Sequence, residues 1–239
     1  MRIVYDDNLF PGIPYDDKLL LDFGFSCIIE EKGLLFDTGA NAKILSNNLE
    51  YFGQLDKIKS VFLSHNHLDH VGGMPTVLEN NSDVKVFAPS SLSASRLAIY
   101  RKKATVHLCT SVEELLPQIF TTGVKGSIPE HSLVFKLKNE WILLTGCSHQ
   151  GIVTIVEDVQ KIVDEKPLTV IGGFHLSGAS EPHLKKIARI LDKFKIKLIG
   201  PSHCSGNLCK KVFADYFGSR YIRTGVGWSL SDQKNQLQL

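Results

Sequence analysis

One short stretch of this 239-residue chain is rich in side chains that bind metal ions. After the apolar residues 61–63 and Ser64, three histidines and one aspartate fall within six positions: His65, His67, Asp69 and His70. Imidazole and carboxylate groups together suit zinc, manganese or iron. Because His65 and His67 are two residues apart at a strand end, they project to one side, and the other two ligands lie on the following turn. One loop can therefore serve two metal ions.

Three later segments share one arrangement, in which a β-like run is followed by glycine or proline and then by a histidine. They are Thr145-Gly146-Cys147-Ser148-His149, Gly172-Gly173-Phe174-His175 and Gly200-Pro201-Ser202-His203-Cys204. Adjacent strands that end on one edge of a sheet bring such loops together. Residues more than a hundred positions apart are therefore predicted to share one metal cluster.

Hydrophobic periodicity and turn residues indicate the elements that carry these loops. Strands are predicted at 2–5, 24–30, 34–37, 60–63, 84–88, 105–108, 132–137, 141–145, 168–171, 196–199, 221–224 and 227–230. Helices are predicted at 40–49, 90–101, 151–163 and 207–216, with another that Ser180 caps. Residues 110–130 show no clear pattern. The order of elements predicts one α/β domain over 1–239, with two sheets covered by helices and a frayed tail from about 232.

Composition narrows the class of protein. A hydrophobic content of 43% and a charged content of 22% are ordinary for a soluble globular protein, and a net charge of +2 does not predict binding to nucleic acid. No stretch approaches the roughly 20 apolar residues that cross a bilayer, and no signal peptide is visible. Five cysteines, an odd number, indicate reduced thiols. We expect a cytoplasmic protein with a small-molecule substrate and no membrane partner; the oligomeric state is not indicated.

The HxHxDH run, the upstream segment Phe36-Asp37-Thr38-Gly39 and the strand-end histidines resemble the metallo-β-lactamase superfamily. This resemblance implies an αββα four-layer sandwich with one or two divalent metal ions at the strand edge. The segments 145–151, 171–176 and 201–206 are more specific. They resemble the subgroup named for the archaeal 7,8-dihydropterin-6-methyl-4-(β-D-ribofuranosyl)aminobenzene-5'-phosphate synthase.

The resemblance also implies metal ligands. His65 and His67 match the first metal site, whereas Asp69, His70 and His203 match the second. The third histidine of the first site is His149, which follows a strand, or His131, which precedes one. His107 lies within an apolar run and is interpreted as a packed histidine.

Three further residues have two interpretations each. Cys147 occupies the position of a bridging aspartate in related hydrolases and of a ligand cysteine in zinc β-lactamases, so it is either a ligand or a small buried neighbour. Asp37 either orients a ligand histidine or forms a turn. His175 either contacts substrate and donates a proton, or is held by the loop backbone.

These residues predict a metal-dependent hydrolase of a small phosphoester, phosphodiester or cyclic ester, with zinc favoured over manganese or iron. A divalent ion lowers the pKa of bound water to about 7. Asp69 takes or orients the proton of the attacking water, and His175 protonates the leaving group.

Three alternatives remain. The first is a transferase that joins a dihydropterin methyl diphosphate to ribofuranosylaminobenzene 5'-phosphate, ranked second because residues 111–130 form a shorter stretch than the subgroup usually has. The next is a non-hydrolytic di-iron redox protein, disfavoured because His67 stands where those proteins usually have glutamate. The last is a metal-binding regulator without turnover, which the full set of ligands disfavours.

Overall fold

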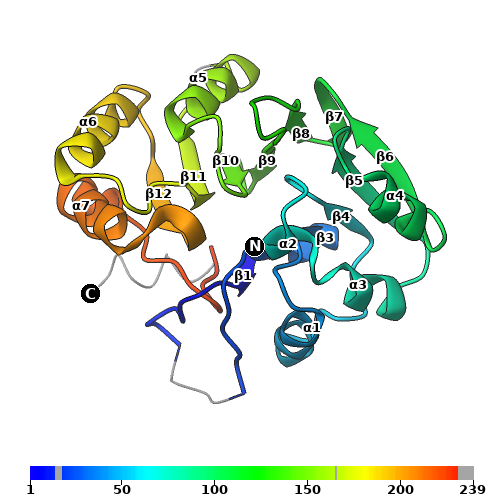
Figure 1. The fold of residues 1–239 in the computed structure, drawn as a ribbon. Helices are drawn as coiled ribbons and strands as arrows, with labels where there is room; N and C mark the ends of the chain where they lie inside the picture. The colour runs from blue at the N-terminus through cyan, green and yellow to red at the C-terminus, as the bar shows by residue number, and fades with distance from the viewer. Residues whose placement is uncertain (14–17, 165, 231–239) are drawn as a thin grey trace. The chain divides into compact units, whose positions relative to one another are not determined.

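In the computed structural model, which describes residues 1–13, 18–164 and 166–230, the chain divides into two compact units. The first unit contains Met1–Leu108 and the described residues from Thr224 onward, and the second contains Cys109–Arg223. Each unit is built on one six-stranded sheet (Figure 1). The tail expected from about residue 232 lies outside the described residues, and the single domain over 1–239 stays a prediction.

The first-unit sheet has the strand order β1-β2-β3-β4-β5-β6. Its strands are β1 (Arg2–Tyr5), β2 (Ser26–Ile29), β3 (Leu34–Phe36), β4 (Ser60–Phe62), β5 (Val84–Pro89) and β6 (Ala104–Cys109). The 3-10 turn η1 (Glu30–Lys32) and the helices α1 (Ala42–Tyr51), α2 (Leu68–Val71), α3 (Met74–Asn80) and α4 (Ala94–Tyr100) complete it. Because β3 and β4 are parallel and Phe36 pairs with Phe62, the residues that follow these strands emerge at one edge.

The second-unit sheet has the strand order β12-β11-β10-β9-β8-β7. Its strands are β7 (Val112–Leu116), β8 (Ile119–Thr122), β9 (Leu133–Leu137), β10 (Glu140–Thr145), β11 (Leu168–Gly173) and β12 (Leu198–Ser202). Its helices are α5 (Ile152–Ile162), α6 (Glu181–Asp192) and α7 (Asn207–Phe217), with the 3-10 turns η2 (His203–Ser205) and η3 (Gly218–Arg220). Since β10, β11 and β12 are parallel, with Thr145 opposite Gly172 and Gly172 opposite Pro201, their following loops share one edge, as predicted.

Apolar packing holds each edge in place. In the first unit, Leu45 of α1 and Val77 of α3 are buried with Val61 of β4. In the second unit, Figure 1 shows α5, α6 and α7 lying along the side of the sheet that holds the parallel strands. The core between these helices and strands includes Val156, Leu184, Phe213, Leu143 and Val170. Burial of each such side chain contributes about 1.5–3 kcal/mol. The loops at the strand ends therefore rest on rigid supports.

Two sequence predictions about the elements are wrong. Residues 110–130 are not irregular, because β7 and β8 form an antiparallel hairpin whose turn places Gln118 at a φ of 63°. The adjacent Glu113 and Glu114 on the edge strand β7 interrupt the alternation of apolar and polar residues by which a strand is predicted. Residues 221–224 and 227–230 form isolated bridges, such as Ile199 with Tyr221, and no strand in the described part of the chain.

Candidate metal centre

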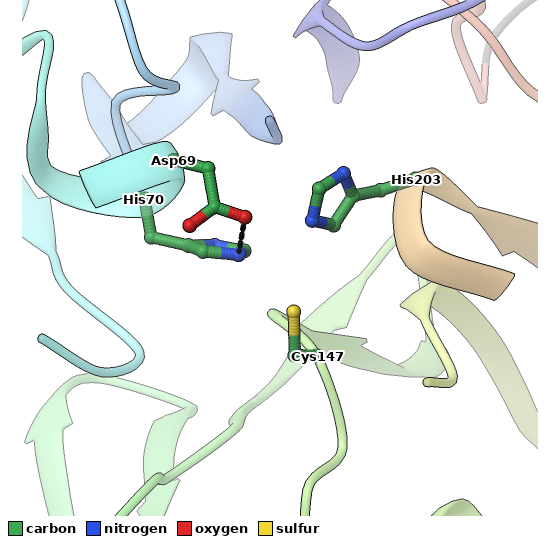
Figure 2. A group of neighbouring side chains, drawn as sticks. All are labelled: Asp69, His70, Cys147 and His203. Carbon is green, nitrogen blue, oxygen red and sulfur yellow. Dashed lines mark ion pairs between the residues drawn. The ribbon is translucent and has the colours of Figure 1, made fainter. Parts of the chain in front are cut away.

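The first unit brings its four predicted ligands together as two pairs. The His65 Nε2 and His67 Nδ1 atoms are 3.1 Å apart, and the His70 Nε2 and Asp69 Oδ2 atoms are 3.4 Å apart. Figure 2 shows the second contact as a dashed line. Two ligand atoms on one tetrahedral zinc ion, each about 2.0–2.1 Å from the metal, lie about 3.3 Å apart. Both pairs therefore fit the spacing of ligands that share an ion.

A single buried carboxylate, that of Asp37, orients both pairs. Its Oδ2 atom accepts hydrogen bonds from His70 Nδ1 at 2.7 Å and from the Ser64 hydroxyl at 2.7 Å. The Ser64 hydroxyl oxygen in turn lies 2.9 Å from His65 Nδ1. The backbone N–H of Ser64 donates to Asp37 Oδ1 at 2.7 Å. Both ligand imidazoles thus present Nε2, the arrangement by which outer carboxylates raise metal affinity. Of the two interpretations of Asp37, these contacts favour the orienting role.

Close backbone packing and a cation fix the same loop. A Cβ atom on Gly72 would lie 2.1 Å from the Ala40 carbonyl oxygen, so only glycine fits after α2. On the loop between His65 and His67, the Arg96 guanidinium donates to the backbone and side-chain oxygens of Asn66, both at 2.6 Å. The ligand spacing is therefore set before any metal binds.

Metal uptake by the first unit is predicted to release a proton. Burial lowers the pKa of His70, but the Asp37 carboxylate and its hydrogen bond, together with Asp69, more than offset this and raise the pKa to about 10. In the metal-free protein, protonation of His70 contributes stability that is fully present below about pH 6.5 and is lost as the pH rises through 10. Burial raises the pKa of its partner Asp37, so the ion pair itself weakens in acid. A metal ion needs the deprotonated Nε2, so its affinity should rise about tenfold per pH unit between pH 6 and 8.

Calorimetric titration of the metal-free protein in buffers of different ionisation enthalpy measures the released proton directly. Asp37→Asn should remove most of that proton release and lower metal affinity about 10- to 100-fold. Asp6→Asn, which alters another buried carboxylate of the first unit, is the matched control and should leave both unchanged. Equal proton release in wild type and Asp37→Asn would contradict the role given to Asp37.

In the second unit, the carboxylate of Glu130 organises the loop after β10. Its Oε1 atom accepts from the backbone N–H groups of Cys147 and Ser148 at 2.7 and 2.9 Å. Its Oε2 atom accepts from the His149 backbone N–H and from His149 Nδ1, both at 2.8 Å. Glu130 is fully buried, and because β9 runs antiparallel to β10, the start of β9 lies beside the end of β10. His149 therefore presents Nε2, as a carboxylate-oriented ligand does.

Cys147 lies at the centre of the potential metal ligands of the second unit. Its sulfur lies within 4.8 Å of a potential ligand atom of each of four residues, His149, His175, His203 and Cys204. Figure 2 shows the Cys147 sulfur pointing toward the His203 ring. Three of the residues around this cluster, Ser148, His175 and His203, have positive φ angles of 60°, 53° and 46°. Such conformations cost about 1–3 kcal/mol each and concentrate at functional sites.

His131 and His107, the other histidines considered for the first metal site, have different surroundings from His149. His131 Nδ1 contacts the Thr121 hydroxyl at 2.7 Å in a fully buried position, and the His107 ring lies edge-on to Phe87 at 6.0 Å, consistent with a packed residue. His175 is exposed and its ring centroid is 4.6 Å from that of His149. Burial of its ring and the neighbouring His149 lower the pKa of His175, against a smaller effect of Glu130, so its neutral form is favoured near pH 7. A proton-donor role for His175 stays a prediction.

Sequence reasoning missed Glu130 and Cys204. Glu130 ends a stretch without a recognisable pattern, and Cys204 follows the predicted ligand His203 but was given no role of its own. One signal pointed to an acceptor near the Gly146–His149 loop: three successive backbone N–H groups following a buried strand need partners. The identity of that partner depends on which strand begins beside β10.

Comparison with known proteins gives the class. A family model for a β-lactamase superfamily domain matches residues 33–106. An uncharacterized protein of Methanocaldococcus jannaschii is 32% identical over 225 residues, covering 79% of this chain and 86% of that protein. The chain belongs to the metallo-β-lactamase superfamily.

Two further likenesses refine this. The synthase of Methanocaldococcus jannaschii that makes 7,8-dihydropterin-6-methyl-4-(β-D-ribofuranosyl)aminobenzene-5'-phosphate is 27% identical over 267 residues, covering 89% of this chain and 91% of that enzyme. The crystal structure of a metal-dependent hydrolase of the β-lactamase superfamily has a TM-score of 0.79 and 24% identity, with 95% of this chain and 96% of that chain covered. The predicted fold class, two mixed sheets flanked by helices in the α/β metallo-β-lactamase fold, is confirmed. None of the described helices has the length and apolar character to cross a membrane.

Proposed function

We propose that this chain is a dinuclear metal-dependent hydrolase, with zinc as the favoured metal, acting on a small phosphoester, phosphodiester or cyclic ester. The observation that carries the proposal is the Asp37 network, which sets two ligand pairs at metal-sharing distances. The donor chemistry of imidazole, carboxylate and thiolate suits zinc. Ligand assignment follows the sequence prediction: His65, His67 and His149 for the first ion, and Asp69, His70, His203 and Cys147 for the second.

The residues have distinct roles in this proposal. A bound divalent ion lowers the pKa of water to about 7, which supplies a nucleophile at neutral pH. The partly exposed Asp69 carboxylate accepts or orients the proton of the attacking water. His175, exposed beside the cluster, contacts the substrate near its leaving group. Asp37 and Glu130 touch no substrate and act by holding the histidines.

The likeness to the synthase supports a second candidate, the pterin transferase. That alignment spans 267 positions, more than the 239 residues of this chain, so the relative contains insertions that this chain lacks. A chain without these insertions has fewer residues to line a pocket for a large pterin substrate. The transferase therefore ranks second.

Elemental analysis and a substrate screen test the proposal together. Protein purified without added metal is expected to contain one to two equivalents of zinc, manganese or iron, consistent with two ligand sets. The screen uses phosphodiesters, phosphomonoesters, lactones and a dihydropterin methyl diphosphate with its arene acceptor. Metal-dependent cleavage of a simple ester supports the hydrolase, whereas pyrophosphate release that requires the arene supports the transferase. Protein that stays inert after reconstitution with each metal would contradict both, and two irons with oxygen reduction would favour the redox protein.

A further inference from the structure

One cysteine pair in the second unit has no role in the proposed function as a pair. The Cys147 and Cys204 sulfur atoms lie 3.3 Å apart, and both residues are buried, with 3% and 9% of their surfaces exposed. A potential ligand nitrogen of His175 lies within 4.8 Å of both sulfurs. These three residues come from the loops that follow the parallel strands β10, β11 and β12.

Two hydrogen bonds donated by backbone N–H groups hold the loops that carry His175 and Cys204 against each other. The Phe174 N–H donates to the Ser205 hydroxyl at 3.1 Å, and the Ser177 N–H donates to the Cys204 carbonyl at 3.2 Å. His175 lies between these two contacts. A Cβ atom on Gly173 would be 2.7 Å from the Cys204 sulfur, so glycine at this position is what allows the thiol to approach. The Cys147 backbone is fixed separately by Glu130.

We propose that Cys147, Cys204 and His175 form a thiol-rich cation site within the second unit, which binds a soft ion such as Zn²⁺ or Cd²⁺ through both sulfurs and the imidazole. Two sulfur ligands and one nitrogen ligand select such ions over magnesium or calcium. Binding displaces one proton from each thiol, because the thiolate is the ligand. Three protein ligands leave a fourth position for water or substrate. Exposed His175 provides the entry path.

The sulfur separation distinguishes this site from a disulfide. Two thiolates on one tetrahedral zinc ion, each about 2.3 Å from it, are about 3.8 Å apart, whereas bonded sulfurs are about 2.05 Å apart. From 3.3 Å, the two sulfurs need a smaller movement to reach the zinc-bound separation than to reach the disulfide bond length. The site shares Cys147 and His175 with the proposed hydrolytic centre, but it does not require the chain to be a hydrolase.

Thiolate-to-cadmium charge-transfer absorbance of the full chain, loaded with no more than one equivalent of Cd²⁺, tests the site. The absorbance per bound ion should fall by about half in Cys204→Ser, because one of two thiolate ligands is lost. Cys209→Ala, which removes a buried thiol of the same unit outside the three-residue set, should leave it unchanged. The variant His65→Ala/His67→Ala should lose activity but keep the band, which separates this inference from the proposed function.

Equal absorbance per ion in wild type and Cys204→Ser, or no band in wild type, would overturn the proposal. A Cys147–Cys204 disulfide found by mass spectrometry in protein that then binds no cadmium would also overturn it, in favour of a redox pair. If Cys204→Ser does not fold, Cys204→Ala serves for the same comparison. X-ray absorption of cadmium-loaded wild type needs no variant: two sulfur neighbours per ion support the site, and one or none contradicts it.

Discussion

Replacing Asp69 with alanine is expected to lower kcat on any true substrate by about 10²- to 10⁴-fold, the range for removal of a general acid or base. The side chain is 21% exposed and contacts His70 Nε2 at 3.4 Å. Its backbone carbonyl, which accepts from the Phe25 N–H at 3.2 Å, is unaffected by the substitution. The fold should therefore persist while the proton acceptor is lost. Steady-state kinetics on the metal-loaded protein, with thermal unfolding alongside, measures both.

The matched control for this substitution is Asp215→Ala. Asp215 lies on the exposed side of α7 in an ion pair with Lys211 four residues earlier, and water screens such surface pairs so that they contribute little to stability. Neither kcat nor the unfolding temperature should change measurably in this variant. Metal content of Asp69→Ala separates loss of the proton acceptor from loss of an ion: restored activity at high metal concentration indicates a ligand role alone. Turnover within tenfold of wild type would be incompatible with the proposed mechanism.

The part of the centre that could be predicted from the sequence is the part that is local. His65, His67, Asp69 and His70 share one loop, so residue type and spacing were enough to propose two ligand pairs. The strand-end histidines were also predictable, because a β run followed by glycine and histidine recurs three times and parallel strands end on one edge. Each of these predictions needed only short-range pattern and one rule of sheet geometry.

The part that escaped prediction depends on pairing between distant strands. Glu130 acts on a loop 17 to 19 residues later only because β9 begins beside the end of β10. The Cys147–Cys204 contact joins residues 57 apart through two parallel pairings. The sequence around Glu130 does not mark its role, and the position of Cys204 after His203 does not show that it meets Cys147. The β7–β8 hairpin was missed for a related reason, since an edge strand with two adjacent glutamates shows no alternation.

Replacing Glu130 with alanine is expected to lower the free energy of unfolding by about 3–5 kcal/mol, the usual cost of removing one partner from a buried charged contact. Four donors lose their acceptor: three consecutive backbone N–H groups and His149 Nδ1. Each buried donor left without a partner costs about 1–3 kcal/mol. Glu130→Gln should cost less, because its amide oxygen still accepts from two of the donors. Chemical denaturation of the metal-free protein measures the loss.

The same substitutions should weaken metal binding beyond their effect on stability. Without the carboxylate, nothing fixes which nitrogen His149 presents, and loss of such an outer partner lowers metal affinity about 10- to 100-fold. Competition with a chelator, at a denaturant-free condition where Glu130→Gln is folded, measures this affinity. Glu140→Gln is the matched control, because Glu140 is exposed in an ion pair with Lys197 and does not contact the loop. If Glu130→Gln kept wild-type affinity while losing stability, Glu130 would support the fold only, and His131 would become the stronger candidate for the third histidine.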